Sequence, residues 1–242
     1  MDGPDVPDEV MRQTLAELDT INKLLGGHAV TLNALDRIFT PELIEAHPKR
    51  IWRIADLGSG GGGMLRAISE WAARRKIAVH LTGIDLNPAT IAYAREKSKQ
   101  YININYKQAD ILSDEFSKTP YDVITSSLFC HHFTNEQLTA LFRQLRQQCT
   151  LAVIVNDIHR HPLAYYSIKW LTAAFSKSYL VKNDAGVSVL RAFTKPELQE
   201  IIKQSGAVKF SIRWKWAFRW QAIIYTGKII PPSHNQQAYS AV

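Results

Sequence analysis

A run of glycines between two patterned segments, in the stretch RIADLGSGGGGMLRAISEW at residues 53–71, constrains the fold more than any other feature of the sequence. Residues 51–57 are mainly apolar and predict a short strand, and the apolar residues after the glycines recur at helical spacing. The segment therefore predicts a strand, a glycine turn and a helix. In such a turn a ligand can approach the main chain without meeting a Cβ atom, and the free N–H groups of the helix N-terminus point toward it.

Two nucleotide cofactors fit this turn. Gly58, Gly60 and Gly63 follow the G-x-G-x-x-G spacing, and Asp85 stands at the end of the next apolar run, about twenty residues further on. These features are typical of a site for NAD. The same spacing also serves S-adenosyl-L-methionine (SAM), whose ribose hydroxyls need an acidic acceptor as well. The turn alone leaves both cofactors open.

Length and composition limit the class of protein. With 242 residues, of which 46% are apolar, the chain is long enough for one sizeable α/β domain. The two cysteines, Cys130 and Cys149, lack metal-ligand spacing, so we expect no metal site, no disulfide scaffold and a reducing, cytoplasmic environment. No apolar run approaches the ~20 residues of a transmembrane helix, and the acidic, proline-containing N-terminus is unlike a signal peptide. The net charge of +7 is scattered, which predicts a solvated surface and no stable nucleic-acid partner.

Strand and helix patterns alternate after the glycine turn. Strands are predicted within residues 79–85, 103–112, 121–133 and 151–158, with helices between them. This alternation implies a parallel sheet with right-handed crossovers. The first fifty residues predict a helical cap, and the composition of residues 231–242 predicts a disordered tail.

The pattern changes after residue 158. Residues 161–177 predict a helix and residues 182–188 a polar loop, before Thr194 opens another helix that ends at Gly206. Residues 208–220 then alternate between apolar and mainly basic positions, which is typical of a half-buried strand with its tryptophans in the core. A short link to a closing strand makes the last two strands antiparallel, because a parallel pair needs a long crossover. A dinucleotide dehydrogenase would continue with parallel crossovers, so this ending favours SAM.

With these features the chain resembles the class I SAM-dependent methyltransferases over residues 18–229. The resemblance implies an α/β fold with a Rossmann-like, seven-stranded, mostly parallel sheet, an antiparallel last strand and helices on both faces. It also implies an N-terminal helical cap at residues 1–50, a methyltransferase domain at 51–230 and a helical lid after strand five, at about 159–193.

Four motifs carry the resemblance, each at the end of a predicted strand: DLGSGGGG, GIDLNP, QADI and SSLFCHHF. The second motif implies that Asp85 accepts hydrogen bonds from the ribose and that Leu86 lies against the adenine. The third implies that Asp110 accepts from the adenine amino group and that Ile111 flanks the ring. Together the motifs imply contacts to SAM, and to its demethylated product S-adenosyl-L-homocysteine (SAH), from Asp56, Gly58, Gly60, Gly62, Asp85, Leu86, Asp110, Ile111 and Ser127.

The chemistry of the cofactor agrees with this assignment. Ligands of open α/β sheets bind at the carboxyl ends of the strands, where these acidic residues are expected. SAM carries a sulfonium and an ammonium, which carboxylates stabilise, whereas Asp56 would repel a pyrophosphate. Two of the acids have structural alternatives, because Asp56 could bind the amides of the glycine turn and Asp110 could cap a helix.

A finer resemblance is to small bacterial methyltransferases of natural-product and quinone biosynthesis that act on hydroxyl groups. It rests on LDTINKLLGGHAVTLNAL, SSLFCHHFTNEQLTALFRQL and NDIHRHPLAYYSIKWLTAAFS with KNDAGVSVLRAF. It implies a small aromatic or polyketide-like acceptor, contacted by His159, Arg160 and Arg191. The segment NDIHRH departs from the pattern, because an arginine or another basic residue often stands in place of His159.

Transfer to a phenol of ordinary acidity also requires the removal of a proton, for which histidine has a suitable pKa. His131 is the expected base or phenol-orienting group, and His132 is expected to turn toward the sheet edge or the following helix. The alternative is that one histidine packs and the other is solvated.

Two other functions stay open. One is an RNA methyltransferase, disfavoured because strand four lacks an N-P-P-Y-like run, and the other is a SAM-binding module without catalysis. The alternative for the aromatic and basic residues 208–220 is a surface that contacts nucleic acid or a membrane.

Overall fold

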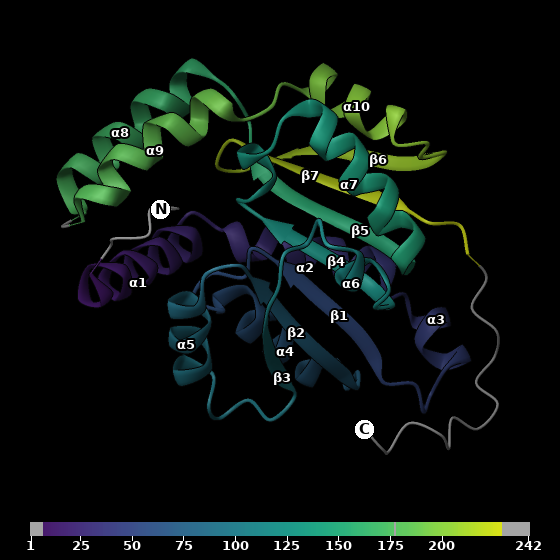
Figure 1. Cartoon of the computed structure of the whole chain (residues 1–242). Helices are drawn as coiled ribbons and strands as arrows, with labels where there is room; N and C mark the ends of the chain where they lie inside the picture. Colours follow the sequence, from purple (N-terminus) through teal and green to yellow (C-terminus); the bar gives the residue numbers. More distant parts are fainter. Residues whose placement is uncertain (1–6, 177, 229–242) are drawn as a thin grey trace.

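The computed structural model describes residues 7–176 and 178–228, so the tail expected at 231–242 lies outside the described residues. Within them, seven strands form one sheet in the order β3-β2-β1-β4-β5-β7-β6 (Figure 1). The strands are β1 Trp52–Leu57, β2 Val79–Asp85, β3 Ile104–Gln108, β4 Tyr121–Ser127, β5 Cys149–Ile158, β6 Lys209–Lys215 and β7 Arg219–Tyr225. β1 to β5 pair in parallel, and β7 runs antiparallel to both β5 and β6. The predicted Rossmann-like sheet with its antiparallel last strand is confirmed.

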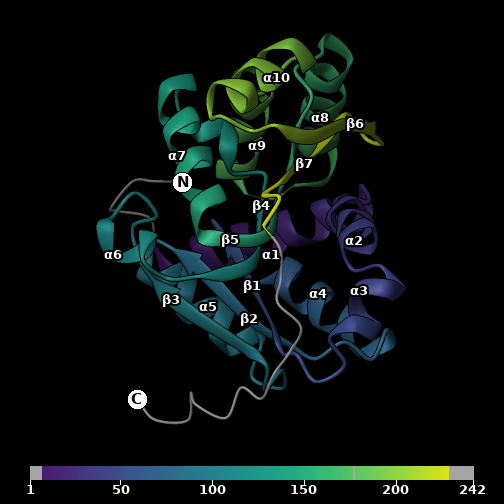
Figure 2. The ribbon, with the colours of Figure 1, turned by 90° about the vertical axis from the view of Figure 1, so that its right-hand side faces the viewer.

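Helices cover both faces of the sheet. One face packs against α2 (Gly27–Ile38), α4 (Gly63–Arg74) and α5 (Pro88–Lys97), and the other packs against α6 (Asp114–Ser117), α7 (Asn135–Gln148) and α10 (Lys195–Gln204). Figure 2 shows α2 and α4 on one side of the sheet and α6 and α7 on the other. Because the strand order reverses between β1 and β4, a crevice opens beyond their carboxyl ends, where ligands of such sheets bind.

Three helices extend over that carboxyl edge, and a fourth precedes the sheet. α1 (Asp8–Leu24) contacts α5 and α9 (Tyr179–Arg191), and α9 packs along α8 (Pro162–Phe175) (Figure 1). The short α3 (Pro41–Ala46) leads into β1. In the described part of the chain, no helix has the length and apolar content that a membrane crossing requires.

The prediction of a polar loop at residues 182–188 is wrong, because these residues lie inside α9. Ser178 caps this helix by accepting a hydrogen bond from the main-chain N–H of Val181. The helix is held by packing on α8: Gly186 is buried, and a Cβ atom there would lie 3.3 Å from the ring of Tyr165. Tertiary contact therefore overrides the polar, glycine-containing local sequence.

The tryptophans of residues 208–220 do not all fill the core as expected. Trp220 in β7 is buried, but Trp214 is 48% exposed and Trp216, in the turn between β6 and β7, is 70% exposed. Phe210 and Ile212 pack against the core that includes α10. β6 is the edge strand, and its last residues run beyond that core toward the carboxyl edge.

Candidate cofactor and acceptor site

A cavity of about 1380 Å³ lies at the carboxyl edge of the sheet. Its walls come from the segments that follow β1, β2, β3 and β4, from α1, α8 and α9, and from the turn between β6 and β7. Sites for a single drug-sized ligand usually measure roughly 300–1,000 Å³. The cavity is therefore large enough for a nucleotide cofactor and a second ligand together.

The glycines of the turn after β1 serve different purposes. Gly58, Gly60 and Gly62 all have positive φ angles, of 63°, 49° and 75°. A Cβ atom on Gly60 would have its nearest neighbour, the side chain of Leu15, 4.0 Å away, so the main chain is open to the cavity there. At Gly58 a Cβ would lie 2.3 Å from the ring of Phe129, and at Gly62 it would lie 2.0 Å from the hydroxyl of Tyr106. Gly62 does not line the cavity, whereas Gly63 does, together with Ser59 and Gly61, which were not singled out.

Asp85 joins the glycine turn to the end of β2. Its Oδ2 accepts a hydrogen bond of 3.1 Å from the N–H of Gly60, and its Oδ1 accepts one of 3.0 Å from the N–H of Asn87. A carboxylate offers about four acceptor positions. These two bonds therefore fix the orientation of a carboxylate, a group that can accept hydrogen bonds from the hydroxyls of a ribose.

Asp56 is the buried acid of the site, with 2% of its surface exposed. Its Oδ1 accepts a hydrogen bond of 2.7 Å from the hydroxyl of Thr125, and not from the amides of the glycine turn. Burial, together with the nearby negative charge of Asp85, raises the pKa of Asp56 to about 7, against the effect of the Thr125 bond. A cation placed beside this carboxyl group would favour its ionised form.

The residues expected around the adenine line the same cavity. Leu86 is 66% exposed, and Ile111 is buried. Asp110 accepts a hydrogen bond of 2.9 Å from the N–H of Leu112, whereas the N-cap of the next helix is Ser113. Asp110 therefore does not cap that helix. Its carboxylate and the exposed Leu86 side chain offer a hydrogen-bond acceptor and an apolar surface to one ligand.

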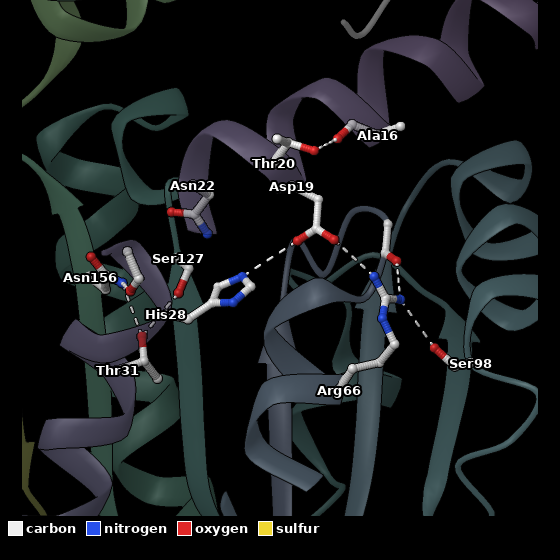
Figure 3. A network of polar contacts seen from close by, with 12 residues as sticks. Ala16, Asp19, Thr20, Asn22, His28, Thr31, Arg66, Ser98, Ser127 and Asn156 are labelled. Carbon is white, nitrogen blue, oxygen red and sulfur yellow. Dashed lines mark hydrogen bonds and ion pairs between the residues drawn. The ribbon is translucent and has the colours of Figure 1, made fainter. Parts of the chain in front are cut away.

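A carboxylate from α1 closes the other side of the turn. Asp19 pairs with Arg66 at 3.0 Å and with His28 at 3.4 Å (Figure 3). Arg66 also donates to the carbonyl of Gly61 at 2.7 Å. Burial would raise the pKa of Asp19, but the neighbouring His28 and the charge of Arg66 hold it below its usual value. This group was not predicted, because no motif marks Asp19 within its helix and its partners lie far along the chain.

Asp19 lies directly over the N-terminus of α4. A Cβ atom on Gly63 would lie 1.7 Å from its Oδ1. A carboxylate in this position is favoured by the free N–H groups and the dipole of the helix. Asp19 therefore brings α1 onto the glycine turn and adds negative charge to the cofactor end of the cavity.

His131 and Asp157 form a buried pair beside the cavity, at the carboxyl ends of β4 and β5. The Nδ1 of His131 lies 2.7 Å from Oδ1 of Asp157, and the main-chain N–H of His131 donates to Oδ2 at 3.3 Å. Burial alone would raise the pKa of Asp157, but His131 and the main-chain N–H of Ile158 hold it below its usual value. Asp157 is thus an ionised partner for the imidazole. It was not predicted, although it stands at the end of a strand that the sequence identifies.

His132 does not turn inward as expected. It is exposed, it lines the cavity, and its ring centroid lies 4.5 Å from that of His131. In the short helical turn Cys130–His132, His131 is buried and held by Asp157, and both histidines line the cavity.

The three residues expected to contact the acceptor lie outside the cavity. Arg160 pairs with Glu197 and donates to the carbonyl of Ala192, which ties the chain after β5 to the start of α10. The ring of His159 packs on Trp220, with centroids 4.6 Å apart. Arg191 is exposed at the end of α9. None of these three side chains lines the cavity, so the structure places none of them against an acceptor there.

The described residues that line the cavity include one arginine. Arg219, the first residue of β7, lines the cavity and is 4% exposed. Ser127, at the end of β4, lines it as well and lies 3.3 Å from the hydroxyl of Thr31 (Figure 3). Among the described residues, no group of three or more histidine, cysteine or acidic side chains is arranged to hold a metal ion.

Known proteins share this fold and part of this sequence. Residues 54–151 match the family described as "Methyltransferase domain". Among solved structures, the chain is similar to the plantazolicin methyltransferase BpumL in complex with SAH, with 19% identity, coverage of 90% of this chain and 94% of that chain, and a TM-score of 0.59. No curated protein sequence matches the chain significantly.

Two further structures are similar over most of this chain. The human N-acetylserotonin methyltransferase in complex with SAM has 14% identity, coverage of 90% of this chain and 56% of that chain, and a TM-score of 0.59. The CMeT domain of the citrinin polyketide synthase has 16% identity, coverage of 76% and 48%, and a TM-score of 0.58. This chain thus spans about half the length of these two chains.

Residues 54–151 thus match a methyltransferase domain, the sheet has the Rossmann-like methyltransferase fold, and the cofactor of that domain is SAM. The residues present fit this cofactor. The main chain at Gly60 is open to the cavity, carboxylates surround the turn, and Leu86 offers an apolar surface. When bound, SAM supplies a methyl group on a good leaving group. The residues placed to hold it are Asp19, Asp56, Gly60, Asp85, Leu86, Asp110 and Ile111.

Proposed function

We propose that this methyltransferase acts on a phenolic or enolic hydroxyl of a small natural product or quinone precursor. The pairing of His131 with Asp157, on the wall of the cavity that also contains the glycine turn, carries this proposal. A hydroxyl of ordinary acidity must lose a proton as it is methylated. A histidine held by a carboxylate is a suitable acceptor for that proton.

The pair defines which nitrogen would act. Because Nδ1 of His131 binds the ionised Asp157, the proton on the neutral ring resides at Nδ1, and Nε2 is the nitrogen with a lone pair. When Nε2 takes a proton, Asp157 stabilises the resulting imidazolium without itself being protonated. The exposed ring of His132 lies beside His131 and is placed to orient the acceptor.

The lid supports a small acceptor. α8 and α9 contribute apolar side chains to the cavity, among them Ile168, Leu171 and Val189. Such walls suit an aromatic or polyketide-like body and keep water from the reacting oxygen. A nucleic acid would instead need a basic, open groove. We therefore favour a small-molecule acceptor over an RNA acceptor.

Carbon acceptors are the main competing chemistry within the same site. Two similar structures are the citrinin CMeT domain and the CurJ carbon methyltransferase, which has 15% identity and a TM-score of 0.56. A base at His131 could also remove a proton from an acidic carbon. The test is therefore incubation with methyl-labelled SAM and a panel of phenols, quinols, enolic polyketides and short RNAs, with the position of the label in the product determined by NMR.

An O-methylated small molecule is the expected product. A label on carbon would contradict O-methylation and indicate a C-methyltransferase, and a label on RNA would contradict the small-molecule acceptor. Binding of SAM by calorimetry without turnover of any acceptor would indicate a SAM-binding module without catalysis.

A further inference from the structure

We propose that the acceptor carries an anionic group, a carboxylate or an equally acidic oxygen, that binds Arg219 beside the methylated hydroxyl. This inference rests on the proposed function, because it specifies the substrate class of the same site. It is carried by the position of Arg219, which was not predicted and which the methyl-transfer chemistry does not use.

Arg219 is a buried cation with incomplete hydrogen bonding. Its Nη2 donates to Oδ1 of Asn22 at 2.9 Å, and its Nη1 donates to Oδ1 of Asn156 at 3.4 Å. Its buried Nε has no hydrogen-bond partner. Both partners are neutral amides, and Figure 3 shows them side by side, Asn22 on α1 and Asn156 on β5. A guanidinium has five N–H groups in a planar fork that matches a carboxylate.

No carboxylate neutralises this cation by direct contact. In the described part of the chain, none lies within the 4.0 Å of an ion pair with Arg219. Burial lowers the pKa of Arg219 to about 10, and the charge of Asp157 partly opposes this effect. Asp157 itself is occupied by His131 and by the main-chain N–H of Ile158. Removing a guanidinium from water without a bound anion is costly, so an anionic ligand is its natural partner.

The distribution of charge in the cavity separates cofactor from acceptor. Arg219 is the only arginine or lysine among the described residues that line it, whereas Asp19, Asp56, Asp85 and Asp110 surround the glycine turn. The cationic cofactor is thus expected at the acidic end. An anion would be repelled there and attracted to Arg219, so the charges also fix the orientation of the acceptor.

The wall beside Arg219 is apolar. The turn between β6 and β7 brings Trp216, Ala217 and Phe218 to the cavity next to Arg219, and Ile168 and Leu171 come from α8. One lid residue, Asp184, is acidic and also lines the cavity. The acceptor that fits is therefore an apolar, preferably aromatic molecule with one acidic group near the hydroxyl that is methylated.

A matched pair of probes tests this inference by binding, independently of turnover. 3-Hydroxy-2-naphthoate and 3-hydroxy-2-naphthamide have the same ring and hydroxyl, but only the first is anionic at neutral pH. Calorimetry on the SAH-loaded protein should show that the naphthoate binds about tenfold more tightly or better, as for a charge-assisted hydrogen bond pair. Arg219→Met should remove this preference, and Arg219→Lys should retain part of it because it keeps the charge.

Arg191→Met is the matched control, since Arg191 is an exposed cation outside the cavity, and it should keep the full preference. Equal binding of the two probes by the wild type, which requires no variant to fold, would overturn the inference. So would a preference that survives Arg219→Met while that variant binds SAH normally. If the preference is present but no hydroxyl compound is methylated, the anion site stands and the proposed reaction is the part that fails.

Discussion

The Nδ1 of His131 lies 2.7 Å from Oδ1 of Asp157, and the two side chains are only 3% and 1% exposed. An aspartate in this position selects the tautomer of the ring and holds its orientation. Asp157 ends β5 and His131 follows β4, so two neighbouring parallel strands bring the pair together at the carboxyl edge. Because Asp157 binds Nδ1, the other nitrogen, Nε2, is the one that can face an acceptor.

Replacing His131 with alanine should leave SAM affinity nearly intact, because the ring borders the acceptor and not the glycine turn. Turnover of a phenol of ordinary acidity should fall by about 10²–10⁴-fold. The loss should be smaller for phenols with electron-withdrawing substituents, which ionise without a base. Initial rates across a series of substituted phenols, with SAM binding measured by calorimetry, check this prediction.

Two further variants test the side chains that contact His131. Asp157→Asn should lose most of the turnover that His131→Ala loses, because an amide does not stabilise the imidazolium. His132→Ala should cost little stability, since this side chain is exposed, and should affect the acceptor KM more than the base step. Equal, small effects of all three substitutions on turnover would remove histidine from the mechanism.

The strand positions, the glycine turn and the acids after β1, β2 and β3 could be predicted because each depends on local sequence. Strand periodicity places Asp56, Asp85 and Asp110 at strand ends, and parallel pairing then brings those ends to one edge. The same rule also applies to Asp157, near the end of β5. It was not predicted, because the resemblance marks the basic residues that follow it and not Asp157 itself.

The remaining parts of the site depend on contacts between distant segments. Arg66 and Asp19 are 47 residues apart, and no local pattern relates them. Arg219 is the first residue of β7. Because β7 runs antiparallel to β5, the start of β7 lies at the edge where the parallel strands end. Arg160 was assigned to the acceptor from sequence, but its position relative to the lid is set by its pairing with Glu197 in α10.

Gly60→Val should weaken SAM binding by at least about tenfold, roughly 1.4 kcal/mol, because its side chain would project where the main chain is open to the cavity. The φ angle of Gly60 is +49°, so part of any effect could come from backbone strain. Gly227→Val is the matched control, with a φ of +71°, open space around it and a position outside the cavity. SAM binding by calorimetry and thermal unfolding of both variants separate the two causes, and wild-type affinity in Gly60→Val would place the cofactor elsewhere.

Asp85→Ala should weaken SAM and SAH by a similar factor, since both carry the ribose, with a loss of about 1.5–3 kcal/mol for charge-assisted hydrogen bonds. Asp85 also holds the N–H of Gly60, so the variant could act through the turn instead. Binding of 5′-methylthioadenosine, which has the ribose but no amino acid part, distinguishes these causes. An equal loss for SAH and methylthioadenosine supports a ribose contact, whereas a loss for SAH alone would assign the effect to the glycine turn.

The stability of the ligand-free protein should depend on pH through Asp56. Because burial raises the pKa of Asp56 to about 7, the folded protein keeps a proton that the unfolded chain releases near pH 4. The resulting contribution to the free energy of unfolding is complete below about pH 4 and is lost as the pH rises through about 7. Between pH 5 and 8 the wild type should therefore lose on the order of 2 kcal/mol relative to Asp56→Asn, whose amide does not titrate. Urea unfolding of both proteins across this range measures the difference, and parallel pH profiles would show that Asp56 is already ionised at pH 5.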